Sequence, residues 1–250
     1  MAKIHIDFKS EILDKNMKIS VIAPIENKNM MEEASVLLLL HGLGNSEYEF
    51  INKANIEEVA IEHNLIIITP FCERGFYCNL VTGVNYFDYT KFEVIKTVQS
   101  CLNINIEDKT RYIMGVSMGG YGAFKLGLDD LNSYAGIGSI SGSVDIIKRD
   151  GEKRTGDKDI ALEWVEMFGE KIDDSNDLFK YLNKDINTAI YMCCGNDDFL
   201  KSYNDKFHDK LLELDIQHMY SEGTGEHTWT YFAPHIREGI KYLIGRENAK

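Results

Sequence analysis

Long apolar runs are missing from this sequence. The longest, residues 36–40, is far shorter than the roughly 20 apolar residues that a membrane-spanning helix needs. The N-terminal residues are charged throughout and contain no apolar segment of the kind found in secretory signals. Prolines are few, with three in 250 residues, and no repeat occurs. We therefore expect a cytoplasmic protein that forms a single domain over residues 1–250.

Basic side chains and metal-binding motifs are also scarce. The 27 lysines and arginines are outnumbered by 40 aspartates and glutamates, which gives a net charge of −13. Such a surface repels nucleic-acid phosphates and anionic lipid heads, so neither nucleic acid nor a membrane is an expected partner. The five cysteines show no CxxC spacing, and HExxH, GxGxxG and GxxxxGK[ST] are all absent. We predict free core thiols in a reducing compartment and no metal site.

What is present is an alternation of buried strands and amphipathic helices. Two early segments, Lys3–Lys9 and Met17–Pro24, alternate apolar and polar residues as half-exposed antiparallel strands do. Apolar residues at helical spacing begin at Phe92, at Leu200 and at Phe232, and each set predicts one face of a helix. The last of these helices would have Pro234 in its first turn. This pattern predicts an α/β fold with a mostly parallel sheet covered by helices on both faces. The mainly apolar runs expected as buried strands are Ser35–Leu40, Leu65–Thr69, Arg111–Val116, Tyr134–Ser141 and Thr188–Cys194.

The segment 145–187 fits this alternation poorly. It is rich in charge, it is longer than an ordinary crossover, and its only helical pattern is short, at Ala161–Phe168. Two interpretations stay open: a lid-like insertion over the strand ends, or a plain surface insertion.

The strongest motif is Gly115-x-Ser117-x-Gly119, which directly follows a buried strand and precedes a helix. A serine at such a tight strand-to-helix turn exposes its hydroxyl, and its strained backbone needs neighbours without bulky side chains. The following helix also places amide dipoles near a developing negative charge. We predict that Ser117 is a nucleophile.

A second glycine-bearing turn, His41-Gly-Leu43-Gly44, closes the strand before it. The backbone N–H of Leu43, with that of Met118, would form an oxyanion hole for an acyl oxygen. His41 precedes the serine, which is the wrong chain order for a general base in this arrangement, so we interpret it as a loop-shaping residue.

The general base is expected among the histidines after Ser117. His208 lies in a helical pattern, His218 in a short strand and His235 just after a proline, so each fits a solvated or packed role better. His227 lies in a glycine-bearing loop between a strand and a helix, with Trp229 close enough in sequence to shield it from water. We therefore predict His227 as the base.

The acid that orients this histidine is less sharply defined. Asp197 and Asp198 both follow a buried strand, and only one can face the imidazole. The other would cap the helix that follows. Asp145, after the preceding strand, is a further candidate.

Taken together, HGLGN, GVSMGGYGA, CGNDDFL and GEHTW, in that order, resemble the esterase D / tributyrin esterase family of α/β-hydrolases over about residues 35–245. The stretch Gly75-Phe-Tyr-Cys-Asn79 resembles it as well. The resemblance implies an α/β-hydrolase fold and a carboxylesterase acting on short acyl chains, with no metal or organic cofactor. It also implies Asp198, the aspartate before the phenylalanine, as the acid, and His227 as the base.

The expected activity is therefore hydrolysis of a small-molecule ester through an acyl-enzyme on Ser117. The same family resemblance also allows two other activities, that of a thioesterase of the S-formylglutathione type and that of an acetyl or feruloyl carbohydrate esterase. A catalytically silent binding domain is the alternative outside enzymes, and it predicts a missing triad residue. The sequence leaves open whether the protein is a homo-oligomer.

Overall fold

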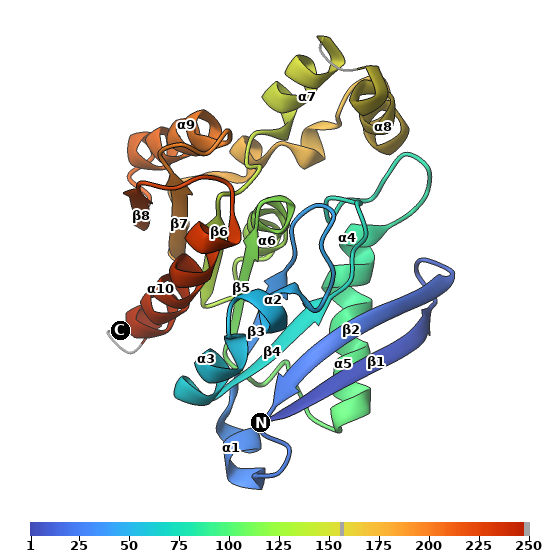
Figure 1. Cartoon of the computed structure of the whole chain (residues 1–250), viewed down its shortest axis with the longest axis vertical. Coiled ribbons are helices and arrows are strands. Elements are labelled where there is room, and N and C mark those ends of the chain that lie inside the picture. Colours follow the sequence, from blue (N-terminus) through green and yellow to red (C-terminus); the bar gives the residue numbers. More distant parts are fainter. Residues whose placement is uncertain (156–157, 248–250) are drawn as a thin grey trace.

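The computed structural model describes residues 1–155 and 158–247, and its frame is a single eight-stranded sheet (Figure 1). The strand order is β1-β2-β4-β3-β5-β6-β7-β8. β1 pairs antiparallel with β2 and β2 with β4, whereas all pairs from β4 to β8 are parallel. The strands are β1 (Ala2–Ser10), β2 (Lys15–Ala23), β3 (Ser35–Leu40), β4 (Leu65–Pro70), β5 (Arg111–Val116), β6 (Gly136–Ile140), β7 (Ala189–Gly195) and β8 (His218–Gly223).

Helices cover both faces of this sheet, as the sequence predicts. Residues of α5, α6 and α9 are buried in the core on one face, and residues of α2, α3 and α10 are buried in the core on the other. The helices are α1 (Lys28–Glu33), α2 (Glu49–Lys53), α3 (Ile56–Glu62), α4 (Tyr86–Asp88), α5 (Val94–Leu102), α6 (Met118–Asp129), α7 (Ile146–Thr155), α8 (Lys158–Phe168), α9 (Lys201–Glu213) and α10 (Trp229–Glu247). The described residues also form a π-helical turn at Tyr89–Glu93 and two 3₁₀ turns, Asp174–Asn176 and Leu178–Tyr181.

The apolar strands divide their side chains between the two cores. In β3, Leu38 and Leu40 pack in the core with α5, α6 and α9, while Leu37 and Leu39 pack in the core with α3 and α10. Successive residues of a strand point to opposite faces, so a run that is apolar at every position is buried on both. The central strands are therefore fixed between two layers, and the loops at their carboxyl ends start from a rigid base.

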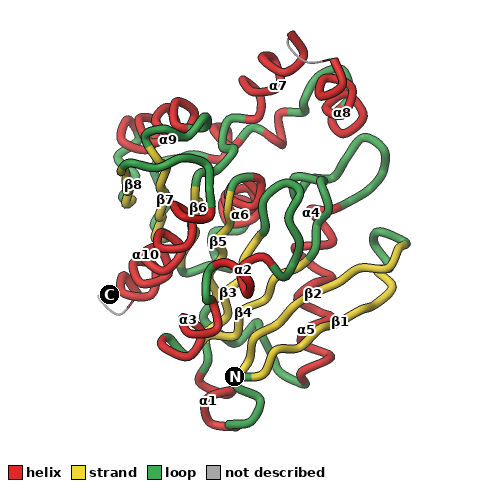
Figure 2. The backbone as a smooth tube through the Cα atoms, in the orientation of Figure 1, coloured by secondary structure: helices red, strands yellow, loops and turns green. Residues whose placement is uncertain are grey.

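The segment 145–187 contains two helices rather than one. α7 and α8 lie at one end of the molecule, beyond the loops that follow the parallel strands (Figures 1 and 2). The short helical piece predicted at Ala161–Phe168 corresponds to the larger part of α8. The prediction of a single helical piece missed α7, because its sequence is strongly polar. Residues 156 and 157 of this segment lie outside the described residues.

Two local predictions are corrected by the structure. The last helix begins at Trp229, so Pro234 lies inside α10 and not in its first turn. Phe92, expected on the buried face of the helix over 92–102, is 56% exposed and lies in the π-helical turn before α5. In this turn the N–H of Val94 bonds to the carbonyl of Tyr89, five residues back and not four. The wider turn changes which side chains face inward, so the simple 3.6-residue periodicity fails at that point.

Candidate active site

Ser117 lies at the sharp turn between β5 and α6, with backbone angles φ 57° and ψ −115°. The motif has glycine at positions 115 and 119 because the neighbouring backbone leaves no space for a side chain at either position. A Cβ on Gly115 would lie 2.1 Å from the carbonyl oxygen of Gly119, and one on Gly119 would lie 2.0 Å from that of Leu40. The backbone N–H of Ser117 donates to the carbonyl of Ile140 in β6, at 2.9 Å. The predicted strand–serine–helix turn is thus confirmed, and its strained serine backbone is held by close packing.

The structure brings Ser117, His227 and Asp198 together. His227, in the loop after β8, has its Nε2 2.9 Å from Ser117 Oγ and its Nδ1 2.8 Å from Asp198 Oδ2. With the ring proton on Nδ1, the imidazole donates to the carboxylate and accepts from the serine hydroxyl. That is the geometry in which a histidine can take the proton of a serine.

Asp198 is suited to hold this histidine. Its side chain is fully buried, and its second oxygen, Oδ1, accepts a hydrogen bond from the backbone N–H of Leu200 at 2.8 Å. Burial by itself would raise the pKa of this carboxyl, but the hydrogen bond and charge of His227, with the Leu200 N–H, keep the pKa below its usual value. The expectation that the other aspartate caps the next helix is wrong. α9 has no side-chain cap, and Asp197 is exposed.

The remaining candidates lie elsewhere. His208 and His218 contact each other, Nδ1 to Nε2 at 2.7 Å, between α9 and β8. His235 Nδ1 lies 2.7 Å from the carbonyl of Tyr231, inside α10. The buried Asp145 accepts from the N–H of Lys148 at the start of α7 and pairs with Lys206 at 2.6 Å. None of these four contacts Ser117 or His227 through a hydrogen bond or ion pair in the described part of the chain.

The two amides expected to form an oxyanion hole flank the serine. Met118 is the first residue of α6, and a helix leaves its first N–H groups without acceptors inside the helix. Leu43 follows Gly42, which packs directly on the serine: a Cβ on Gly42 would lie 3.4 Å from that of Ser117. The turn is closed by the N–H of Asn45 donating to the carbonyl of Gly42 at 3.1 Å. Both N–H groups therefore start from positions next to the candidate nucleophile.

His41 shapes this turn and is fully buried. Its Nε2 accepts from the N–H of Cys72 at 2.9 Å, so the ring proton is on Nδ1, which lies 2.8 Å from the carbonyl of Gly42. Both ring nitrogens of the neutral form are thus used. Burial lowers the pKa of His41 to about 4, against a weaker opposing effect of the Gly42 carbonyl. These contacts support the loop-shaping interpretation.

Acidification is therefore expected to destabilise the fold through His41. Its pKa is about 4 in the folded chain and near 6.5 when unfolded, so between these values the unfolded state binds a proton that the folded state does not. The free energy of unfolding should fall by about 3 kcal/mol in all as the pH drops through these two values, with most of the loss between pH 6.5 and 4 and none from this group below about pH 3. Urea unfolding of the parent and of His41→Gln, between pH 4 and 8, measures this. The stability difference between them should change across that window, and a difference that stays constant with pH would contradict the account.

Aromatic side chains enclose His227, but not the one that the sequence suggests. The His227 ring lies 4.6 Å from that of Phe199 and 5.0 Å from that of Phe232, measured between centroids. Trp229 packs instead against Phe50 and Phe232. Phe199 is 62% exposed, so it forms part of the outer surface of the site. Sequence reasoning missed it as a site residue, although it directly follows Asp198.

A cation, Arg149 of α7, is the second site residue that sequence reasoning missed. Its guanidinium lies 5.6 Å from the centroid of the Phe199 ring and donates to Ser143 Oγ at 2.6 Å. Ser143 in turn donates its backbone N–H to the carbonyl of Ser117, at 3.1 Å. No local motif signals this residue, because its contact with Phe199 joins α7 to the distant turn after β7.

The cysteines do not contribute a second nucleophile here. All five are free; four are buried and Cys101 is exposed, which corrects the expectation that all are core thiols. Cys78 lies with its Sγ 3.5 Å from the hydroxyl of Tyr121, and burial raises the pKa of its thiol. Among the side chains that the structure describes, those of residues 1–152 and 162–246, no group of three or more His, Cys, Asp or Glu is placed to hold a metal ion. No described helix is both long and apolar enough to cross a membrane.

Comparison with solved structures shows the fold. The fluorophosphonate-binding serine hydrolase F of Staphylococcus aureus superimposes with a TM-score of 0.83 at 24% identity, over 97% of this chain and 98% of that one. The S-formylglutathione hydrolase FrmB of Staphylococcus aureus gives a TM-score of 0.80 at 24% identity, with the same coverage. The fold is that of the α/β-hydrolases, as the sequence predicts.

Comparison by sequence extends this from fold to family. The acetyl esterase of Caldicellulosiruptor saccharolyticus is 28% identical over 97% of this chain and 98% of its own length. Residues 10–243 match the family model Esterase, described as "Putative esterase". Because that match spans nearly the whole chain, the protein belongs to the Esterase family and is a serine hydrolase of the esterase D type with an α/β-hydrolase fold.

Proposed function

We propose that this serine carboxylesterase hydrolyses short-chain acyl esters, with Ser117 as nucleophile, His227 as general base and Asp198 as orienting acid. The observation that carries this proposal is the unbroken hydrogen-bonded series from Asp198 through His227 to Ser117. A silent binding domain would be expected to lack one of these groups, and all three are present.

The mechanism follows from this geometry. His227 Nε2 takes the proton of Ser117 Oγ as that oxygen attacks the ester carbonyl carbon. The N–H groups of Met118 and Leu43 then stabilise the negative oxygen of the tetrahedral intermediate. The imidazolium, held by Asp198, returns its proton to the departing alcohol. A water molecule, deprotonated by the same imidazole, releases the acid from the acyl-enzyme.

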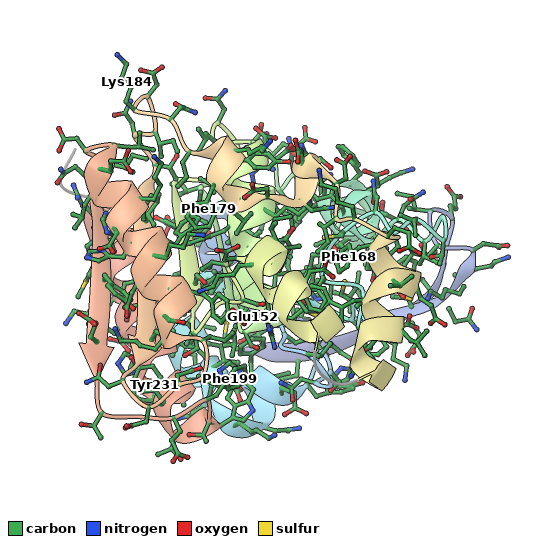
Figure 3. The ribbon with its side chains drawn as sticks, turned by 90° about the horizontal axis from the view of Figure 1, so that it is seen from above. Glu152, Phe168, Phe179, Lys184, Phe199 and Tyr231 are labelled. Carbon is green, nitrogen blue, oxygen red and sulfur yellow. The ribbon has the colours of Figure 1, made fainter. Side chains whose placement is uncertain are left out.

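The segment 145–187 is proposed to be a fixed cover over the strand ends. The buried Lys125 of α6 reaches it with two hydrogen bonds, 2.7 Å to the carbonyl of Ser175 and 2.6 Å to Asn176 Oδ1. Tyr121 of α6 donates to the carbonyl of Asn176 at 2.8 Å. At its other side, Phe168 at the end of α8, labelled in Figure 3, packs against Phe76. Because the segment is anchored on both sides, these contacts favour a fixed cover over a lid that opens and closes.

A preference for short acyl chains is supported by the acetyl esterase relative. The free cysteines support the expected cytoplasmic location, because reducing compartments keep thiols unpaired. The expected result for p-nitrophenyl esters from acetate to palmitate is a kcat/KM that is highest for acetate to butyrate. It should fall by about 100-fold or more for the longest chains, which a small acyl site cannot enclose. A maximum at palmitate would contradict the short-chain proposal.

The thioesterase alternative uses the same three residues. It is separated from the esterase by comparing kcat/KM for an acetyl thioester and its matched oxoester, and the oxoester is expected to be the better substrate. A carbohydrate esterase would instead hydrolyse acetylated or feruloylated sugars faster than p-nitrophenyl acetate.

A further inference from the structure

Arg149 places a positive charge beside the candidate active site of a chain whose net charge is −13. It is partly exposed, and its guanidinium is two hydrogen bonds away from the backbone of Ser117, through the hydroxyl and the N–H of Ser143. The same guanidinium lies over the ring of Phe199, whose own ring contacts that of His227. In the view from above, Phe199 lies beside the helix α7 that carries Arg149 (Figure 3).

This guanidinium has no carboxylate within ion-pair distance among residues 1–152 and 162–246, whose side chains the structure describes. The arginines at 74 and 237 differ, because they pair with glutamates: Arg74 with Glu163, and Arg237 with Glu58 and Glu62. The acidic groups that influence Arg149 from further away are already engaged. Asp198 is bound by His227, and Glu152 accepts from the hydroxyl of Tyr203.

A guanidinium at this place is costly unless an anion joins it. Burial lowers the pKa of Arg149, which reflects a penalty on its charged form. Only the Ser143 hydroxyl is bonded to it within the described residues, although a guanidinium carries five N–H donors. Arginine binds carboxylates through two parallel hydrogen bonds, so the remaining donors form a ready site for such a group.

The side on which Arg149 lies indicates which half of the substrate would carry the anion. The alcohol must leave next to His227, because that imidazole returns the proton to it. Arg149 approaches the site across Phe199, the ring that lies against this imidazole, whereas the acyl oxygen is directed to the amides of Leu43 and Met118. The guanidinium is thus nearest to the alcohol half.

We propose that Arg149 binds a carboxylate on the alcohol half of the ester, with Phe199 packing against the apolar body of that alcohol. This inference rests on the proposed function and narrows its substrate class to esters of carboxylated alcohols or phenols. Arg149 would then determine substrate specificity. Phe199 would have a role in binding, which explains why so large an apolar side chain is exposed.

The test compares 4-acetoxybenzoate with its neutral counterpart 4-acetoxybenzamide, by kcat/KM for release of the phenol. For the parent we expect a preference for the anionic ester that falls by about 10-fold or more in Arg149→Gln, mostly through KM. Arg149→Lys, which keeps the charge but not the two-pronged geometry, should retain part of the preference. Lys148→Gln is the matched control: it removes the adjacent charge of α7, which pairs with Glu152 at 3.9 Å, and should leave the preference unchanged within about twofold.

The outcomes separate this inference from the proposed function. If the parent hydrolyses both esters with no preference, or if Arg149→Gln slows both to the same extent, Arg149 does not select the anion and the inference is overturned, while the proposed function stands. A loss of preference as large in Lys148→Gln would also overturn it, since a general surface field would then suffice. A parent inactive on both esters would overturn the proposed function and this inference with it.

Discussion

Replacing Ser117 by alanine is expected to lower kcat for p-nitrophenyl acetate by about 10⁶-fold, because no acyl-enzyme can form without its hydroxyl. Alanine removes only the Oγ that lies 2.9 Å from His227 Nε2. The backbone turn, the buried contacts of α6 and the amides of Met118 and Leu43 should all remain. What is left is the modest acceleration that binding and an oxyanion hole supply without a nucleophile.

The matched control for this variant is Ser133→Ala. The Ser133 hydroxyl donates to Asp130 on the turn between α6 and β6, at the edge of the sheet opposite the site loops. Its loss should change kcat by less than about twofold. Active-site titration of both variants, with circular dichroism to show that each is folded, completes the comparison. Residual activity of Ser117→Ala above about one per cent of the parent would show that another group performs the attack.

The second large effect is expected for Asp198→Asn, which should lower kcat by about 10⁴-fold. An asparagine amide can present an N–H to His227 Nδ1 and so favour the tautomer in which Nε2 carries the proton, and that nitrogen could no longer accept the proton of Ser117. The negative charge that stabilises the imidazolium is lost as well. The substitution leaves the side-chain volume nearly unchanged, so the fold should be preserved.

Asp197→Asn is the control that the chain itself provides. Asp197 is exposed, and its backbone N–H, bonded to the carbonyl of Gly225 at 3.0 Å, is unaffected by the change. Its kcat should stay within about threefold of the parent. Steady-state kinetics of the two variants side by side assign the acid: a larger loss in Asp197→Asn than in Asp198→Asn would reverse the assignment.

Much of this arrangement could be predicted from the sequence because its signals are local. Five apolar runs correspond to β3 to β7 within two residues at each end, since a strand buried on both faces must be apolar at nearly every position. The turn at Ser117 is equally local: Gly115 and Gly119 have carbonyl oxygens where side chains would begin. His227 could be chosen by its loop context and chain order alone.

Other features could not be predicted, because they depend on contacts between distant segments. The two aspartates after β7 are adjacent, and only the turn that buries one and exposes the other decides between them. The stacking of Arg149, Phe199 and His227 joins α7 to two loops that are distant in sequence, so no spacing in the chain predicts it. The prediction that Trp229 shields His227 is wrong for a related reason. Trp229 is two residues from His227 in sequence, but its ring packs against Phe50 and Phe232 and not against the imidazole.

The central claim is that the hydroxyl of Ser117 is the attacking group, and covalent labelling tests it most directly. The protein is treated with a fluorophosphonate probe, its mass is measured, and the labelled peptide is sequenced by mass spectrometry. We predict a single adduct on Ser117, formed at a much lower rate in His227→Ala because the hydroxyl then has no base. An adduct on another residue, or equally fast labelling of Ser117 without His227, would contradict it.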